Sequence, residues 1–508
     1  MPLLSWANRD ADLTRAALAP YRLLEPVANL SNGDPESPNM LIEGDNLDAL
    51  KALLPYYAGQ VKCVFIDPPY NTKSAFEHYD DNLEHSQWLS MMYPRLELLR
   101  ELLAEDGSLW VTLDDNEAHY FKVIADEVFG RPNFLLDMTW HRKISPANDA
   151  KHFSNDNDHL FVYAKSSDGL AINRLERNER NNSVFKNPDN DSRGAWNSVT
   201  LTGNKTKEER PNLYFKVVGP QGQEVWPPDG LTWRSSPDTY AQMAANGLIY
   251  WGKDGTSRSP RIKRFASEAK PVIPRSLWHY GDVGHTQEAM LESKKMFGQE
   301  AFFGTPKPER LVKRILEIAT NPGDLVLDSF LGSGTTAAVA HKMGRRWIGI
   351  EMGEHARTHC QPRMVKVVDG EQGGISESVG WNGGGGFRFF KLGVPVFDED
   401  GRIDASIRFE HLAAHVWFAE TGTPRSSRAK KAPFLGEHKG IGYYLLFNGI
   451  LGDERKDTGN VLTRRLLRSL PAFDGPKVIY GEACALTEEQ LRELDITFRQ
   501  TPYDIRAR

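Results

Sequence analysis

The stretch VFIDPPYNT, residues 64–72, decides the fold class. Residues 64–66 end an apolar run that predicts a buried β-strand. The two prolines that follow have no N–H group to donate, so the strand must end where Asp67 begins. In open α/β sheets, ligands bind at the carboxyl ends of the strands. We therefore expect Asp67 and Tyr70 to face a ligand.

Apolar segments with strand and helix periodicity alternate on both sides of this stretch. Gly and Pro separate them, as at Gly107 and at 322–323. This alternation predicts an α/β fold. The strands are expected at 40–45, 61–66, 108–113, 324–330 and 346–351, and the helices at 46–54, 86–104, 309–319 and 336–343.

A second motif, DSFLGSGTTAAVA at 328–340, has the pattern strand, glycine loop, helix. Glycines let the backbone approach a ligand closely, and a helix N-terminus offers free N–H groups. Glu351 ends the next strand, where an acid commonly binds a ribose hydroxyl. Neither GxGxxG nor GxxxxGK[ST] occurs, so the loop favours a nucleoside without phosphates, such as S-adenosylmethionine.

The bulk composition describes an ordinary soluble protein. A chain of 508 residues is expected to split into two to four domains. The three cysteines form no CxxC pattern, which predicts a reducing, cytoplasmic location. No signal peptide and no membrane-spanning run are found. The net charge of −6 argues only weakly against a nucleic-acid partner, because local basic patches matter more.

The middle of the chain differs from both flanks. It is rich in Asn, Lys, Arg, Pro, Gly and Trp and has few periodic apolar segments, which predicts an inserted, irregular domain. The predicted organisation is an N-terminal extension (1–37), two core halves (38–165 and 301–370), the insert (166–300), a linker (371–386) and a C-terminal α/β domain (387–508).

Together these motifs resemble the amino-methyltransferases that modify exocyclic nitrogens of DNA bases. In that family DPPY is the catalytic motif and D-x-F-x-G-S-G-T the cofactor loop. The catalytic motif comes first here, which is the order of the permuted β-group. The segments GDNLDAL (44–50), TPKPERLVKRIL (305–316) and FLGSGTT (330–336) are similar to modification subunits of type III restriction–modification systems. The resemblance implies a Rossmann-like, S-adenosylmethionine-dependent methyltransferase fold, permuted, with the insert as target-recognition domain.

The resemblance also implies roles for individual residues. The catalytic residues would be Asp67, Pro68, Pro69 and Tyr70. The Asp67 carboxylate and the Pro68 carbonyl would accept the target amine hydrogens, and Tyr70 would stack on a flipped base. The cofactor would contact Asp45, Thr305, Lys307, Asp328, Phe330, Gly332, Gly334, Thr335 and Glu351. Asp45 has a second interpretation, a plain helix N-cap.

The remaining predictions concern partners. Double-stranded DNA is the implied substrate, and a homodimer and a restriction (helicase or nuclease) subunit on a separate chain are the implied partners. Phosphate contacts are expected from basic residues of the insert, although for any single one of them a solvated loop is the commoner explanation: Lys253, Arg258, Arg261, Lys263 and Arg264. No metal site is predicted, because His411 and His415 share a helix face without a third ligand.

Two alternatives to adenine N6 methylation stay open. One is a methyltransferase for cytosine N4 or for RNA adenine. The other is a DNA-binding specificity subunit without turnover, although both motifs are intact.

Overall fold

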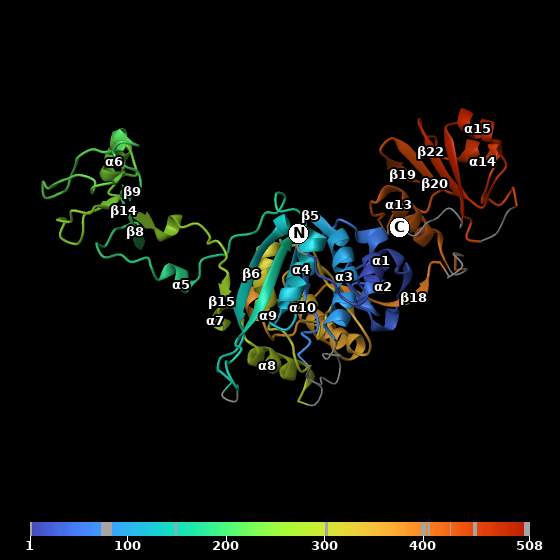
Figure 1. Ribbon diagram of the computed structural model, residues 1–508, viewed down its shortest axis with the longest axis horizontal. Helices are drawn as coiled ribbons and strands as arrows, with labels where there is room; N and C mark the ends of the chain where they lie inside the picture. Colours follow the sequence, from blue (N-terminus) through green and yellow to red (C-terminus); the bar gives the residue numbers. More distant parts are fainter. Residues whose placement is uncertain are drawn as a thin grey trace. The chain divides into compact units, whose positions relative to one another are not determined.

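The computed structural model describes residues 3–72, 84–147, 150–299, 303–397, 403–404, 407–426, 428–450 and 455–501. The chain divides into two compact units (Figure 1). The first unit comprises Met1–Asn173 and Arg275–Arg508, and the second comprises Arg174–Pro274. No helix within these described ranges combines the length and the apolar character needed to cross a membrane.

A mixed sheet of eleven strands forms the centre of the first unit. All neighbouring pairs from β18 to β5 are parallel, and β7 then pairs antiparallel with β5 and β6. The α/β fold class is thereby confirmed. In order across the sheet the strands are β1 (Arg22–Pro26), β18 (Gly386–Pro395), β3 (Met40–Glu43), β17 (Arg346–Glu351), β16 (Leu325–Asp328), β4 (Val61–Ile66), β5 (Leu103–Leu113), β7 (Asn157–Ala164), β6 (Phe134–His141) and β15 (Leu277–Trp278), with β2 (Asn32–Gly33) beside β18.

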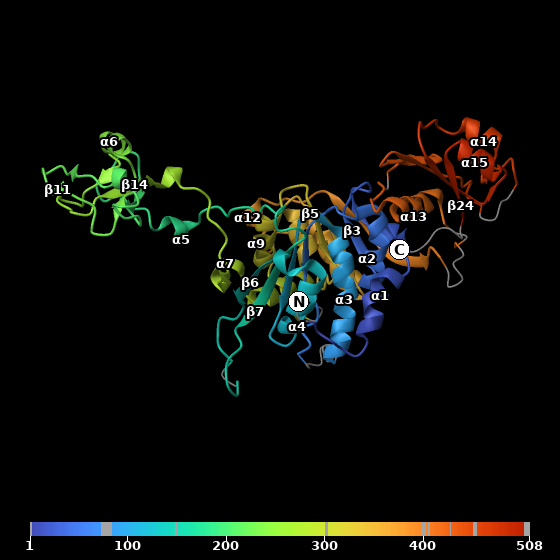
Figure 2. The ribbon, with the colours of Figure 1, turned by 45° about the horizontal axis from the view of Figure 1, so that its top comes forward.

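Helices cover both faces of this sheet (Figure 2). The connection β4–α3–β5 and the connection β16–α10–β17 run in opposite directions along the sheet. Because such crossovers are right-handed, their helices lie on opposite faces. One layer contains α1 (Arg9–Leu18), α2 (Asn46–Tyr57), α3 (His85–Leu102) and α4 (Ala118–Phe129), and the other contains α9 (Glu309–Ala319), α10 (Thr335–Lys342) and α11 (Gln361–Val368).

The predicted elements of the core are confirmed, several of them at their predicted bounds. Strands β4 and β17 and helix α9 begin and end as the periodicity predicts. Apolar side chains of the core strands are buried completely, for example Val64 of β4, Leu327 of β16 and Ile350 of β17 at 0 % exposure. Burial of these apolar segments stabilises the fold, which explains why they alternate along the sequence.

The division of the chain differs from the predicted one in three places. The second unit is shorter than the expected insert, because β15, α7 (Tyr280–Val283) and α8 (Thr286–Phe297) belong to the first unit. The predicted N-terminal extension supplies β1 and β2 to the main sheet, and the predicted C-terminal domain supplies β18.

The third difference is the predicted linker, 371–386, which packs against the core. Ile375 is 1 % exposed, and its N–H donates to Oε2 of the buried Glu309. Gly374 has φ +55°, and a Cβ there would lie 2.1 Å from the same Oε2. Gly374 therefore serves close packing, a role that composition alone does not separate from flexibility.

A smaller sheet follows near the C-terminus. It contains β19 (Phe434–His438), β20 (Ile441–Leu445), β22 (Lys477–Gly481) and β24 (Ile496–Gln500), with α13 (Phe409–Thr421), α14 (Arg464–Ser469) and α15 (Glu488–Glu493) nearby in sequence. His415 of α13 packs in the core against Tyr21 and Phe397. Burial lowers the pKa of His415 to about 3, so this side chain is neutral.

The second unit has a core of its own. Short strands β8 (Trp196–Thr200), β14 (Arg261–Phe265) and β13 (Ile249–Tyr250) form a three-stranded sheet, and α6 (Pro237–Ala245) follows in the chain between β8 and β13. Two-stranded ladders join β9 (Thr202–Gly203) to β12 (Thr232–Trp233) and β10 (Val217–Val218) to β11 (Glu224–Val225). The buried core residues are Leu201, Val217, Val225, Trp233 and Trp251.

Candidate active site

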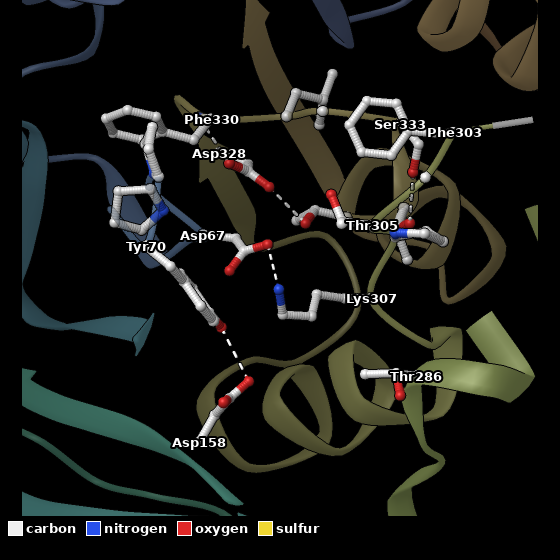
Figure 3. Close-up of a pocket in the computed structure, with 18 of the residues that line it drawn as sticks. Asp67, Tyr70, Asp158, Thr286, Phe303, Thr305, Lys307, Asp328, Phe330 and Ser333 are labelled. Carbon is white, nitrogen blue, oxygen red and sulfur yellow. Dashed lines mark hydrogen bonds and ion pairs between the residues drawn. The ribbon is translucent and has the colours of Figure 1, made fainter. Parts of the chain in front are cut away.

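Asp67 lies directly after β4, at the carboxyl edge of the sheet. Thr112 of the neighbouring strand β5 donates a hydrogen bond of 2.6 Å from Oγ1 to Oδ1 of Asp67. Lys307 forms an ion pair with the other oxygen, Oδ2 (Figure 3). The Asp67 side chain keeps 23 % of its surface exposed. Its two oxygens are thus held in fixed directions while the carboxylate still faces open space.

Tyr70 is held by a second carboxylate at the same edge. Its hydroxyl donates to Oδ2 of Asp158 at 3.1 Å (Figure 3). Oδ1 of Asp158 pairs with Nε of Arg142 at 2.6 Å. Burial raises the pKa of Asp158 to about 6, although Arg142 and Lys307 act to lower it. Burial and the nearby carboxylates raise the pKa of Tyr70 well above its usual value, so the phenol keeps its proton.

Two further contacts fix the turn between Asp67 and the following residues. Trp88 of α3 donates from Nε1 to the carbonyl of Pro69 at 2.8 Å. Asn71 adopts φ +58°, and its amide donates to Oε1 of Glu117 at 2.6 Å. Asn tolerates this left-handed backbone better than most residues. The motif is therefore rigid on both sides of Tyr70.

The glycine loop follows β16 and ends at α10. Asp328 accepts hydrogen bonds from the N–H of Phe330 at 2.9 Å and from Oγ1 of Thr336 at 2.6 Å. These bonds close the loop over the end of the strand. Burial is the largest influence on Asp328 and raises its pKa to about 7.

Glycine is required inside this loop for its backbone conformation. Gly332 has φ +56° and Gly334 has φ +83°, the left-handed region that glycine adopts without strain. A Cβ on Gly332 would lie 3.4 Å from the ring of Phe303. The N–H of Gly332 donates to Oε2 of Glu351 at 2.6 Å, so Glu351 supports the loop from β17.

One cavity of about 390 Å³ lies between the two motifs. The motifs meet there because β4 and β16 are hydrogen-bonded neighbours in the sheet. Thr286, Met290 and Phe303 contribute a further wall. The sequence-predicted residues that line the cavity are Asp67, Pro68, Pro69, Tyr70, Thr305, Lys307, Asp328, Phe330, Gly332 and Thr335.

Three residues predicted for the cofactor, Asp45, Gly334 and Glu351, are not among those that line the cavity. Asp45 caps α2, where its Oδ1 accepts from the N–H groups of Leu47 at 2.8 Å and Asp48 at 3.3 Å. Its Oδ2 pairs with Arg95 at 3.0 Å. These contacts correspond to the second interpretation of Asp45, a helix N-cap, because short acidic side chains satisfy the free N–H groups of a first turn.

Thr112, Arg142 and Asp158 are functional candidates that sequence reasoning missed. They lie in or next to β5, β6 and β7, three strands that are adjacent in the sheet. The weak signal was Asp158, an acid at the start of the apolar run HLFVYA. Only the antiparallel pairing of β7 with β5 brings it to the edge where Asp67 lies.

The basic residues predicted to bind DNA all belong to the second unit. Lys253, Arg258 and Arg264 are exposed. Arg261 donates to Oγ and to the carbonyl of Ser198, at 2.7 Å and 3.0 Å. Three of the four side chains are thus exposed, and Arg261 of β14 is held against Ser198 of β8.

Lys263 is different from its neighbours, since it is 9 % exposed and its ammonium forms ion pairs with Asp189 and Asp191. The distance to Asp191 is 2.8 Å. The Lys263 charge is thus neutralised inside the second unit, and its contacts indicate a structural role.

Comparison with known proteins shows the family to which the chain belongs. The DNA methylase family model matches residues 61–361, the range from β4 to the helix after β17. The chain belongs to the DNA methylase family. The methylase is 32 % identical over 412 residues to a probable type III restriction–modification enzyme HindVI Mod subunit of Haemophilus influenzae, covering 71 % of this chain and 55 % of that one.

A second relative of the methylase is the type III restriction–modification enzyme EcoPI Mod subunit of Escherichia phage P1. The identity is 30 % over 401 residues, covering 66 % of this chain and 60 % of the relative. Among solved structures, a modification methylase of Thermus thermophilus in complex with S-adenosylmethionine is 14 % identical with a TM-score of 0.34, over 69 % of this chain and 99 % of that one. The methylase spans little more than half of the first of these relatives.

Proposed function

We propose that this methylase transfers a methyl group from S-adenosylmethionine to N6 of adenine in duplex DNA. The observation that carries the proposal is the shared cavity, in which the Asp67 carboxylate and the Tyr70 ring face the glycine loop. The glycine loop, which would bind the nucleoside, and the DPPY motif, which would bind the exocyclic amine, thus line the same cavity. This is the arrangement that a transfer between the two requires.

The residues of the loop fit S-adenosylmethionine. The ring of Phe303 and the side chain of Leu331 offer apolar surface for an adenine, and Ser333 and Thr335 offer hydroxyl groups to polar atoms. When bound, this cofactor supplies a methyl group on a positively charged sulfur. Asp328 lines the same space, and a neighbouring cation would favour its ionised form.

Asp67 and Pro68 would prepare the target amine. An adenine amino nitrogen is a poor nucleophile, because its lone pair is shared with the ring. When the Asp67 carboxylate and the Pro68 carbonyl each accept one N–H hydrogen, the lone pair localises on nitrogen. This stabilisation grows as positive charge develops on nitrogen, so it favours the transition state. Tyr70, held by Asp158, would stack on the base, which must leave the duplex to reach the cavity.

The cellular role follows from the relatives and is part of the proposal. Two of them are named Mod subunits of type III restriction–modification enzymes. We propose the same role here, in the cytoplasm, as a homodimer with a restriction subunit on a separate chain. In this arrangement the second unit selects the sequence, and its exposed Lys253, Arg258 and Arg264 contact phosphates.

Single-molecule sequencing of genomic DNA from cells that express the methylase tests the proposal. Cells that express Asp67→Ala at the same level are the matched control. We expect N6-methyladenine at one sequence motif with the wild type and none with the control. N4-methylcytosine at the motif would show that the target is cytosine and not adenine. Equal methylation in both cultures would show that Asp67 takes no part in the reaction.

A further inference from the structure

Lys307 occupies the space that the proposed function gives to the target base. Its ammonium pairs with Oδ2 of Asp67 and lies 4.9 Å from the centroid of the Tyr70 ring (Figure 3). The target amine would need that same oxygen, and the target ring would need that same aromatic face. The lysine thus makes one contact that the proposed function gives to the amine and one that it gives to the ring.

The two occupants exclude each other. Oδ1 of Asp67 already accepts the hydroxyl of Thr112, so Oδ2 is the oxygen directed at a second donor. Oδ2 could accept a second hydrogen bond, but an ammonium 4.9 Å from the centroid of the Tyr70 ring occupies the face on which the base would stack. Lys307 must therefore leave Asp67 before the base can be methylated.

Asp158 is another carboxylate of the same cavity, which Asp114 and Asp328 also line. It is 3 % exposed, and its pKa of about 6 shows that Arg142 compensates its buried charge only in part. Its Oδ2 already accepts the Tyr70 hydroxyl, so a cation arriving there also touches the group that holds the stacking ring. The four-carbon stem of lysine is flexible enough for such a transfer between neighbouring carboxylates.

We propose that Lys307 is a positioning residue that reserves the target-base site and moves from Asp67 to Asp158 when the base enters. The inference rests on the proposed function. It assigns Lys307 to the base side of the cavity, where the family resemblance had implied the cofactor side. The lysine keeps the Asp67 charge compensated while the site holds no base.

The experiment compares four variants with the wild type. They are Lys307→Met, Asp158→Asn, the combination of both, and Lys313→Met as a control on α9, where Lys313 pairs with Glu317 of its own helix. Steady-state methylation of unmethylated phage DNA gives kcat and the DNA concentration at half-maximal rate. Calorimetry with S-adenosylhomocysteine gives cofactor-site affinity without DNA.

We expect Lys307→Met to lower the half-maximal DNA concentration at least threefold and to change S-adenosylhomocysteine affinity less than twofold. Asp158→Asn should raise that concentration at least threefold while Lys307 is present, and this effect should vanish in the double variant. A tenfold loss of S-adenosylhomocysteine affinity in Lys307→Met would place the lysine on the cofactor instead. An equal effect of Asp158→Asn in both backgrounds would also overturn the proposal.

A melting experiment separates this inference from the proposed function. Lys307→Met should lower the Tm because Asp67 loses its partner, and adding Asp67→Asn should restore it. If the wild type methylates no DNA, the proposed function fails, and the exchange of lysine for base fails with it, whatever the Tm values are. If the wild type methylates DNA but Asp67→Asn restores nothing, the function stands and the role of Lys307 is wrong.

Discussion

Thr112, near the end of β5, donates its hydroxyl hydrogen to Oδ1 of Asp67, at the end of the neighbouring strand β4. The strands fix this contact, because β4 and β5 are parallel and in register at their carboxyl ends. The hydrogen bond sets the rotation of the carboxylate. It therefore decides where Oδ2 points.

Replacing Thr112 by Val should slow methyl transfer by roughly ten- to a hundredfold. A hydrogen bond to a charged group contributes about 1.5–3 kcal/mol. Without this bond the Asp67 carboxylate is no longer held in the orientation that methyl transfer needs. The single-turnover rate at saturating DNA and cofactor is the measurement. Thr112→Ser keeps the hydroxyl and should stay within threefold of the wild type. A full rate in Thr112→Val would mean that other contacts orient the carboxylate.

Asp328 should make stability depend on pH. Its pKa is raised from an ordinary value near 4 to about 7, so the folded protein binds this proton more tightly than the unfolded chain. The resulting stabilisation is complete below about pH 4 and is lost as the pH rises towards 7. The free energy of unfolding should fall by up to about 1.4 kcal/mol per pH unit in this window on account of this group.

The measurement is urea unfolding between pH 4 and 8 for the wild type and for Asp328→Asn. The variant should show a shallower decline, because its amide does not titrate. Glu97 and Glu292 also have pKa values raised to about 7, so the difference between the two proteins isolates Asp328. Asp254→Asn, on an exposed turn of the second unit, is the control. Identical curves for Asp328→Asn and wild type would remove this group from the linkage.

A buried ion cluster ties the glycine-rich stretch to the core. Glu309 is 1 % exposed and pairs with Lys342 at 2.8 Å and with Arg363 at 2.8 Å. Glu309→Ala removes the carboxylate that pairs with the buried Arg363 and leaves Lys342 with Glu371, so it should cost about 3–5 kcal/mol of unfolding free energy. Glu317→Ala, on the outer side of α9, should cost less than about 1 kcal/mol. Equal losses for both, by urea unfolding, would contradict this role.

The second unit offers a test of DNA contact. Lys253→Ala and Arg258→Ala should each weaken DNA binding, and each should reduce the slope of log affinity against log salt concentration by about 1. Lys263→Met should instead lower the Tm, because Asp189 and Asp191 lose their common partner. Fluorescence anisotropy with a duplex at several salt concentrations gives the slopes. An unchanged slope for both exposed variants would place the phosphate contacts elsewhere.

The sequence predicted what is local in the chain. The apolar runs marked β4, β16 and β17, and the prolines after Ile66 marked the edge at which Asp67 lies. Thr112, Arg142 and Asp158 escaped prediction, because they reach the site through pairing among β5, β7 and β6, which no local pattern specifies. The stretch 371–386 was misjudged for a related reason. A run of glycines predicts flexibility unless the partner that needs close packing is known, and that partner is Glu309.

The strand order has a consequence for synthesis of the chain. Strands β3 and β4 emerge early, but β17 and β16 lie between them in the sheet. Until residues 325–351 have left the ribosome, these two strands lack the neighbours that join them. The catalytic turn after β4 is therefore synthesised long before the glycine loop after β16, with which it forms the cavity. Nascent chains arrested before this point should be open to protease at the catalytic turn, while those arrested after it become resistant together with β3, β17, β16 and β4.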